Sequence, residues 1–152
     1  MLPKSLSIIL VLLISSAWCF GQSIDDPNID LAQKNIGKNI FQKIKNGDLR
    51  SIYLGKITDK NRKVKFYVVK EFSRIKAAMV YHGHSRLIFY NADKKFKAQY
   101  QFDMPDELPV KLKANTLYFI DKNQKPAKTL TLLINDRFPE QIFNSNQVSF
   151  IQ

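Results

Sequence analysis

Hydrophobic and polar side chains alternate most regularly between residues 95 and 103. The apolar members of this alternation are Phe96, Ala98, Tyr100 and Phe102. Successive side chains of a β-strand point to opposite faces, so a period of two predicts a strand with one apolar and one polar face. This strand closes a stretch of three strand patterns, residues 73–103, which we expect to form the centre of the fold.

Strand patterns of this kind recur along most of the chain. They lie at residues 50–57, 63–72, 75–81, 86–90, 95–102, 110–112, 117–120, 128–135 and 148–151. The first two predict a hairpin, and a turn is expected at 82–85, where Gly83 and Ser85 interrupt the apolar pattern. Residues 148–151 are only a possible final strand, and for the sheet we expect about seven antiparallel strands from these nine patterns.

A different period appears near the N-terminus, where residues 29–46 carry apolar side chains close to helical spacing. These side chains are Ile29, Ala32, Ile36, Ile40, Phe41 and Ile44. The stripe predicts an amphipathic helix that packs on the sheet. Asn28 or Asp30 can cap its first turn, and Gly47 can end it.

Several strands are apolar on both faces, because aromatic residues are adjacent at 66–67, 89–90 and 118–119. Strands of this kind need a cover on each side. Two α+β architectures meet that need. We favour an N-terminal amphipathic helix packed against a curved antiparallel sheet of about seven strands, and the alternative is a small β-barrel or sandwich with a helical plug.

The first residues of the chain are typical of a secretory signal peptide. Lys4 precedes an apolar run over 6–20 that is shorter than the roughly 20 residues a bilayer span needs. Cys19 and Gly21 put small residues at the −3 and −1 positions of a cut after residue 21. We expect a signal peptide at 1–21, a polar leader at 22–28 and a single domain at 29–152, exported to the periplasm or the cell exterior.

Cleavage at this position changes the composition. It removes Cys19, the one cysteine of the chain, so we expect no disulfide and no thiol chemistry. Small domains secreted by eukaryotes are often rich in disulfides, so this favours a bacterial protein. The loss of Lys4 lowers the formal charge from +11 to +10, which favours an anionic envelope component or an acidic protein as partner. Nucleic acid is not expected, because the chain is exported.

Candidates for chemistry are few. The two histidines, His82 and His84, have the spacing that puts both rings on one face of a strand, and Glu71, Asp93 or Asp103 could add a third metal ligand. The predicted turn at 82–85 argues against their convergence, so they remain weak metal candidates. The chain has no Gly-x-Ser-x-Gly motif and no glycine-rich phosphate loop, and we predict neither a catalytic residue nor a cofactor.

Four lysines and one tyrosine on two predicted strands form the candidate binding site. Its members are Lys63, Lys65, Tyr67, Lys95 and Lys97. The function that follows is a non-enzymatic exported binding module with a basic sheet face. The alternatives are a carrier of a small apolar ligand or lipid in a pocket between helix and sheet, and a metal-dependent enzyme that uses His82 and His84.

Overall fold

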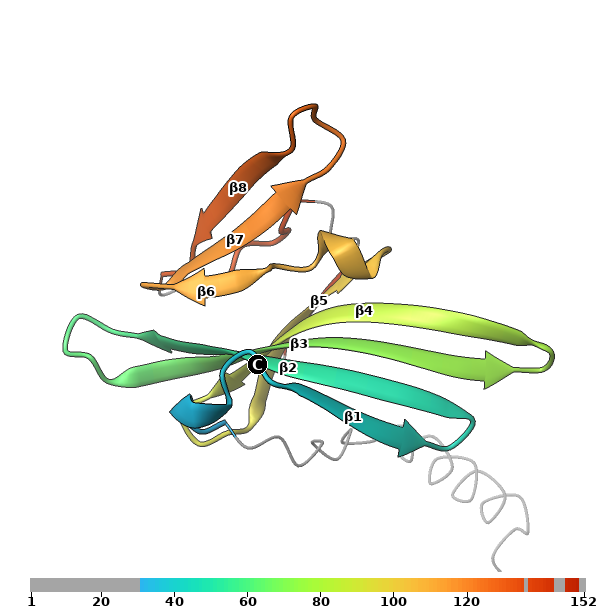
Figure 1. Cartoon of the computed structure of the whole chain (residues 1–152). Coiled ribbons are helices and arrows are strands. Elements are labelled where there is room, and N and C mark those ends of the chain that lie inside the picture. The colour runs from blue at the N-terminus through green and yellow to red at the C-terminus, as the bar shows by residue number, and fades with distance from the viewer. Residues whose placement is uncertain (1–30, 136, 144–146, 151–152) are drawn as a thin grey trace, which may run out of the picture.

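The computed structural model describes residues 31–135, 137–143 and 147–150, and its described part consists mainly of strands. Six strands form the large sheet in the order β1-β2-β3-β4-β5-β9, and three form the small sheet in the order β6-β7-β8 (Figure 1). The large sheet contains β1 (Asn39–Ile44), β2 (Gly47–Thr58), β3 (Val64–Ala77), β4 (Val80–Asn91), β5 (Phe96–Phe102) and β9 (Gln147–Phe150). The small sheet contains β6 (Lys111–Lys113), β7 (Thr116–Asp121) and β8 (Lys128–Leu133).

All strand pairs are antiparallel, which confirms the β-rich antiparallel part of the predicted fold. The favoured single sheet is wrong in one respect, because the strands divide into two packed sheets. This arrangement is nearer to the alternative sandwich. The helical part of the prediction does not appear in the described residues, where helical turns are limited to two 3-10 helices, Gln33–Asn35 and Pro105–Glu107.

The amphipathic helix predicted for 29–46 is replaced, over the described residues 31–46, by one 3-10 turn and strand β1. Gly37 adopts a φ of 77°, which interrupts a right-handed helix. The chain then reverses at Asn46, whose φ of 63° suits asparagine in a hairpin turn. Gly47 therefore follows a hairpin turn and does not cap a helix.

The turn predicted at 82–85 is also misplaced. Strand β3 continues to Ala77, the chain reverses at Ala78 and Met79, and β4 begins at Val80. The segment from His82 to Ser85 is thus part of a continuous strand. Ala78 adopts a φ of 55°, a conformation that alanine rarely takes and that its sequence does not signal.

The main hydrophobic core lies between the two sheets. The large sheet contributes Leu54, Ile57, Val68, Leu87, Phe89, Ala98, Tyr100 and Phe102, and the other side contributes Leu108, Leu117, Phe119, Ile134 and Ile142. The rings of Phe102 and Phe119 are 6.3 Å apart across the sheets. The buried Tyr100 hydroxyl donates to the Pro139 carbonyl at 2.7 Å, and burial raises the pKa of this phenol.

A second core cluster lies on the opposite face of the large sheet. Its buried members are Leu31, Tyr53, Val69, Ile88 and Tyr90. Adjacent residues such as Val68 and Val69 are therefore both buried, one on each face, as the paired apolar residues predicted. Phe96 departs from the predicted alternation. It packs against this second cluster because the register shifts between Phe89 and Tyr90, while Ala98, Tyr100 and Phe102 face the main core.

The predicted signal peptide and leader, residues 1–28, lie outside the described residues. Among the residues that the structure does describe, no helix has the length and apolar character needed to cross a membrane.

Candidate functional site

The five residues of the predicted lysine site occupy different structural settings. Lys63 belongs to the β2–β3 loop and Lys95 to the β4–β5 turn, where their backbone N–H groups donate to the side chains of Asp59 and Asn91 at 2.9 Å. Both loops lie at the same end of the large sheet, because β2 and β4 run in the same direction between antiparallel neighbours.

The other three members lie on strands. Lys65 and Tyr67 are on β3, but Tyr67 is half-buried against the second core cluster, with its ring 6.3 Å from the ring of Tyr53. Lys97 lies at the register shift of β5, and strand β4 separates it from β3. The structure therefore places the two loops at the same end of the sheet but does not align all five residues in one row. Ligand binding by these residues stays a prediction.

His82 and His84 lie on β4 and face the same side of the sheet, opposite Ile75 and Ser73 of β3. Both are exposed. In the described part of the chain, no group of three or more histidine, cysteine, aspartate or glutamate residues is arranged to hold a metal ion. Of the proposed third ligands, Glu71 is instead buried in an ion pair with Arg86.

A more coherent surface lies on the face of the large sheet that packs on the small sheet, further along the strands where the small sheet does not cover it (Figure 1). We call it the basic-aromatic face, and it consists of Phe41, Lys43, Arg50, Arg74 and Tyr81. These residues share one side because of the strand register. Phe41 is paired with Arg50, and Lys43 and Arg74 are both paired with Asp48. Four different strands thus contribute to it.

Three cation–ring contacts organise this face. The Lys43 ammonium is 5.3 Å and the Arg50 guanidinium 5.9 Å from the centre of the Phe41 ring. The Arg74 guanidinium is 5.8 Å from the centre of the Tyr81 ring. Each contact contributes on the order of 0.5–1 kcal/mol at an exposed site. Phe41 is 50% exposed and Tyr81 is 60% exposed, so the rings and their cations are presented together to the exterior.

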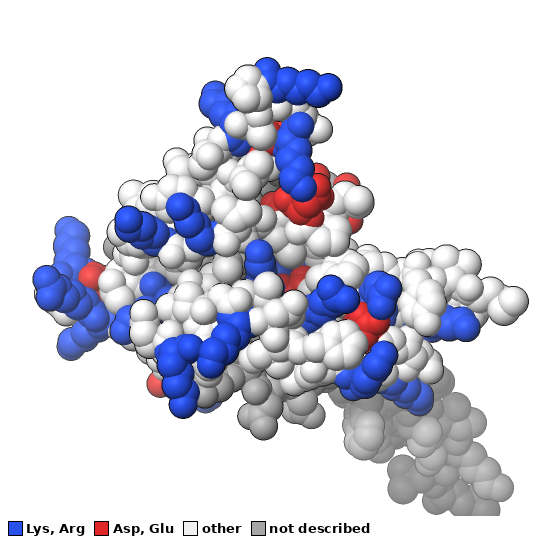
Figure 2. Space-filling model, viewed as in Figure 1, with Lys and Arg blue, Asp and Glu red and all other residues white. Residues whose placement is uncertain are grey.

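Asp48 is the carboxylate beside these cations. Its oxygens accept hydrogen bonds from Arg74, 2.6 Å from Nη2 and 3.2 Å from Nε. This hydrogen bonding, with further attraction from Lys43 and Arg50, holds the pKa of Asp48 below its ordinary value, although burial opposes the shift. One carboxylate therefore faces three cations, and the face keeps a net positive charge. Figure 2 shows blue side chains around red ones on this part of the molecule.

A second ion pair is on the opposite face of the same sheet. Arg86 donates from Nη2 to Glu71 Oε1 and from Nη1 to Gln99 Oε1 at 3.4 Å. The Glu71 side chain is 1% exposed, and its Oε2 has no hydrogen-bond partner. Arg86 is therefore committed to a buried carboxylate, and this pair serves the fold.

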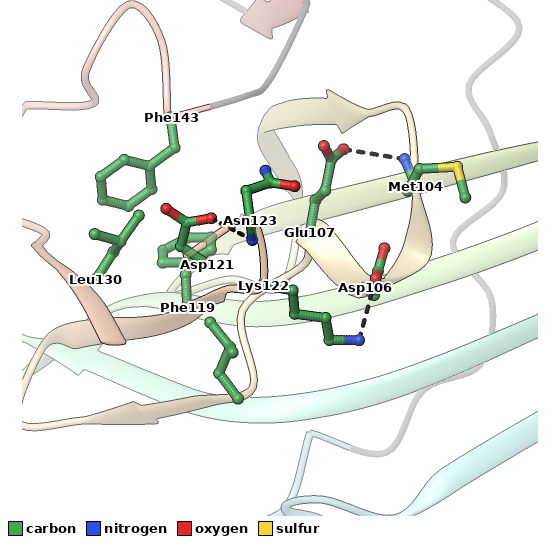
Figure 3. Close-up of a pocket in the computed structure, with 10 residues that line it drawn as sticks. Met104, Asp106, Glu107, Phe119, Asp121, Lys122, Asn123, Leu130 and Phe143 are labelled. Atoms are coloured by element: carbon green, nitrogen blue, oxygen red, sulfur yellow. Dashed lines mark hydrogen bonds and ion pairs between the residues drawn. The ribbon is translucent and has the colours of Figure 1, made fainter. Parts of the chain in front are cut away.

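A cavity of about 450 Å³ opens on the small sheet (Figure 3). Its apolar lining includes Phe119, Leu130 and Phe143, and the Phe119 and Phe143 rings meet edge to face at 4.9 Å. The cavity borders the β7–β8 hairpin and the 3-10 helix Pro105–Glu107. It does not lie between a helix and the large sheet, where the carrier hypothesis placed a pocket.

Carboxylates at the rim of this cavity are engaged in contacts with their own loops. Asp106 pairs with Lys122 at 3.1 Å, and Glu107 accepts the Met104 backbone N–H at 3.1 Å. Asp121 accepts the Asn123 backbone N–H at 3.0 Å (Figure 3). These acids order the turns that surround the cavity.

Comparison of the chain with known proteins finds no matching family model, no matching curated protein and no matching solved structure.

Proposed function

We propose that this protein is an exported, non-enzymatic binding module that binds an anionic component of the bacterial envelope through the basic-aromatic face. The observation that carries the proposal is the set of three cation–ring contacts on an uncovered part of one sheet face. The formal charge of +11 gives the whole chain the same electrostatic preference.

The chemistry of this face fits anionic groups that are repeated along a surface or polymer. Arg50 offers a planar guanidinium group of the kind that binds phosphate or carboxylate through two hydrogen bonds. Arg74 already donates from Nε and Nη2 to Asp48, so it adds positive charge through the outer edge of its guanidinium group. Lys43, Arg50 and Arg74 lie on three neighbouring strands, β1, β2 and β3, whose backbones are about 5 Å apart from one strand to the next, so several cations can meet one extended anion. Exposed charges of this kind lose attraction as salt increases, because the Debye length falls to about 10 Å at 0.1 M.

The test is binding to a soluble polyanion and to anionic vesicles by the wild-type protein, a K43Q/R50Q variant and a K111Q/K113Q variant. Lys111 and Lys113 are exposed lysines of β6, so both variants lose the same charge. Each cation near an anionic surface contributes on the order of 1 kcal/mol, so K43Q/R50Q should bind about 30-fold more weakly. The control should change much less. Equal losses in the two variants would show that net charge alone drives binding.

A second candidate, carriage of a small apolar ligand, is favoured by the apolar lining of the cavity in Figure 3. Its volume falls within the range of small-molecule pockets. Native mass spectrometry of the purified protein tests this candidate, because a carried ligand adds a defined mass that is lost on denaturation. A protein of unmodified mass, with no uptake of added fatty acid, would remove it.

A further inference from the structure

The hairpin β3–β4 ends in an exposed apolar tip, which we define as Ala77, Ala78, Met79 and Val80. Met79 is 89% exposed and Val80 is 60% exposed, which makes Met79 the most exposed large hydrophobic residue of the described chain. Adjacent exposed apolar side chains at the end of a projecting element make the tip a candidate interaction site.

The tip projects because its strands have lost their other neighbours. Strand β2 pairs with β3 only as far as Ile75, after which Lys76 donates its N–H to Asn46 of the β1–β2 turn at 2.7 Å. Strand β5 pairs with β4 only from Ser85 onward. Beyond these points β3 and β4 pair only with each other, and Figure 1 shows this ribbon extending past the neighbouring strands.

Cations and an aromatic ring surround the base of the tip. Lys76 is paired with Tyr81 directly below the last strand pair, and Arg74 contacts the Tyr81 ring. The Lys76–Asn46 hydrogen bond brings Lys45, in the same turn as Asn46, to this level. With a rise of about 3.4 Å per residue, Lys76 lies about 3 Å and Arg74 about 10 Å below Ala77 along the strand. In Figure 2 the outermost part of the projection on the right is white, and blue side chains lie on its lower edge and nearer the body of the molecule.

We infer that the partner of this surface is an anionic phospholipid bilayer, and that the apolar tip inserts into its interface. This inference rests on the proposed function, since Arg74 and Tyr81 belong to the basic-aromatic face. The order of apolar, aromatic and basic side chains along the ribbon matches the order of layers at a membrane surface. Apolar side chains enter the boundary between headgroups and acyl chains, which is about 5–10 Å deep, the tyrosine ring lies at headgroup level, and the cations reach lipid phosphates.

Charge also argues for lipid over a second copy of this chain. A symmetric contact between two tips would bring the basic residues at the base of one tip, Lys76 and Lys45, toward those of the other copy. Like charges brought together in this way repel, whereas phosphatidylglycerol-type headgroups neutralise them. An oblique approach of the ribbon turns the rest of the basic-aromatic face toward the same headgroups.

Depth-dependent fluorescence quenching tests the insertion. Trp18, the one tryptophan of the chain, lies in the predicted signal peptide at 1–21, so Met79→Trp carries the single reporter in the exported protein, residues 22–152. Met104→Trp, at an exposed methionine beside the cavity on the small sheet, is the matched control. With phosphatidylglycerol vesicles containing brominated lipid, emission from the Met79→Trp variant should shift to the blue and be quenched, while emission from the Met104→Trp variant should do neither. Equal quenching in both variants, or in neither, overturns the insertion.

Affinity measurements separate this inference from the proposed function. The M79S/V80S variant should bind phosphatidylglycerol vesicles about 10- to 100-fold more weakly, because two buried apolar contacts are lost, and should bind soluble polyphosphate as wild type does. Every variant carries the same N-terminus, so any contribution of that segment is common to all. If M79S/V80S binds vesicles as wild type does and K43Q/R50Q binds them more weakly, the insertion of the tip is refuted and the proposed function stands. Binding to polyphosphate but not to vesicles refutes the lipid partner, and binding to neither refutes the proposed function as well. A dimer that M79S/V80S dissociates would identify a second copy as the occupant.

Discussion

Replacement of Arg86 by methionine should destabilise the protein far more than its modest exposure suggests. The Arg86 side chain is 20% exposed, but its carboxylate partner Glu71 is 1% exposed and already has one oxygen without a hydrogen bond. In an R86M variant, the remaining oxygen would lose its cation while solvent stays excluded. Removal of one partner from a buried ion pair costs about 3–5 kcal/mol, because an uncompensated charge remains inside the protein.

The loss is measurable by urea denaturation and thermal melting. For a domain of this size, each kcal/mol corresponds to about 4 °C, so R86M should melt about 12–20 °C below wild type. The matched control is K122M, which removes the cation of the exposed Lys122–Asp106 pair. An exposed pair contributes about 0–1 kcal/mol, so this control should be nearly neutral.

A double variant completes the test. E71L/R86M replaces both charges with apolar groups of similar size, and should recover most of the stability that R86M loses. If R86M and K122M lose equally little, Glu71 is not held as a buried charge in the folded protein. If E71L/R86M is as unstable as R86M, the loss comes from packing of the Arg86 side chain and the electrostatic explanation is wrong.

Gly47→Ala should lower the free energy of unfolding, measured by urea denaturation, by at least about 2 kcal/mol, because an added Cβ would lie 1.9 Å from the Arg74 carbonyl oxygen. An unchanged free energy would show that the two strands are not this close at Gly47. The lowered pKa of Asp48 adds stability above its ordinary value of 3.8, which is lost as pH falls through the folded-state pKa. The stability difference between wild type and D48N should therefore shrink below about pH 4. Burial raises the pKa of Tyr53 to about 12, so the free energy of unfolding should fall as pH rises from 10 toward 12. The fall should be less steep in Y53F, and absorbance of the phenolate follows the ionisation.

Much of the strand content was predictable because it depends on local alternation. The hairpin of β2 and β3 and the strand β5 appear close to their predicted positions. The burial of Ala98, Tyr100 and Phe102 on one face follows directly from their period of two. Local pattern is sufficient where a strand is regular and its neighbours lie close in sequence.

The errors arose where two local signals compete. Ile36, Ile40 and Ile44 fit a helix, but β-branched isoleucine also favours a strand. Hydrophobic and polar residues do not alternate over 40–44, so the strand shows only in the burial, which alternates along β1. The Asn46-Gly47 pair is a strong hairpin signal that competes with the helical stripe. By contrast, the reversal at Ala78-Met79 has no glycine, proline or asparagine, so its position could not be predicted from turn chemistry.

The candidate site depends on register, which a single sequence does not reveal. Phe41 and Arg74 are 33 positions apart in the sequence, and their common face follows from the pairing of β1, β2 and β3. A shift of one residue in any of these pairs would turn the side chains to the other face. The basic charge of the chain was evident, but the rings that organise it were not.

The most direct test of the account is the affinity of a K43E/R50E variant for vesicles that contain anionic phospholipid. The account predicts binding by wild type that weakens as salt increases, loss of that binding in K43E/R50E, and retained binding in K111E/K113E, with all three proteins equally folded by circular dichroism. Wild-type affinity in the K43E/R50E variant, or no preference of the wild type for anionic over neutral vesicles and polymers, would contradict it.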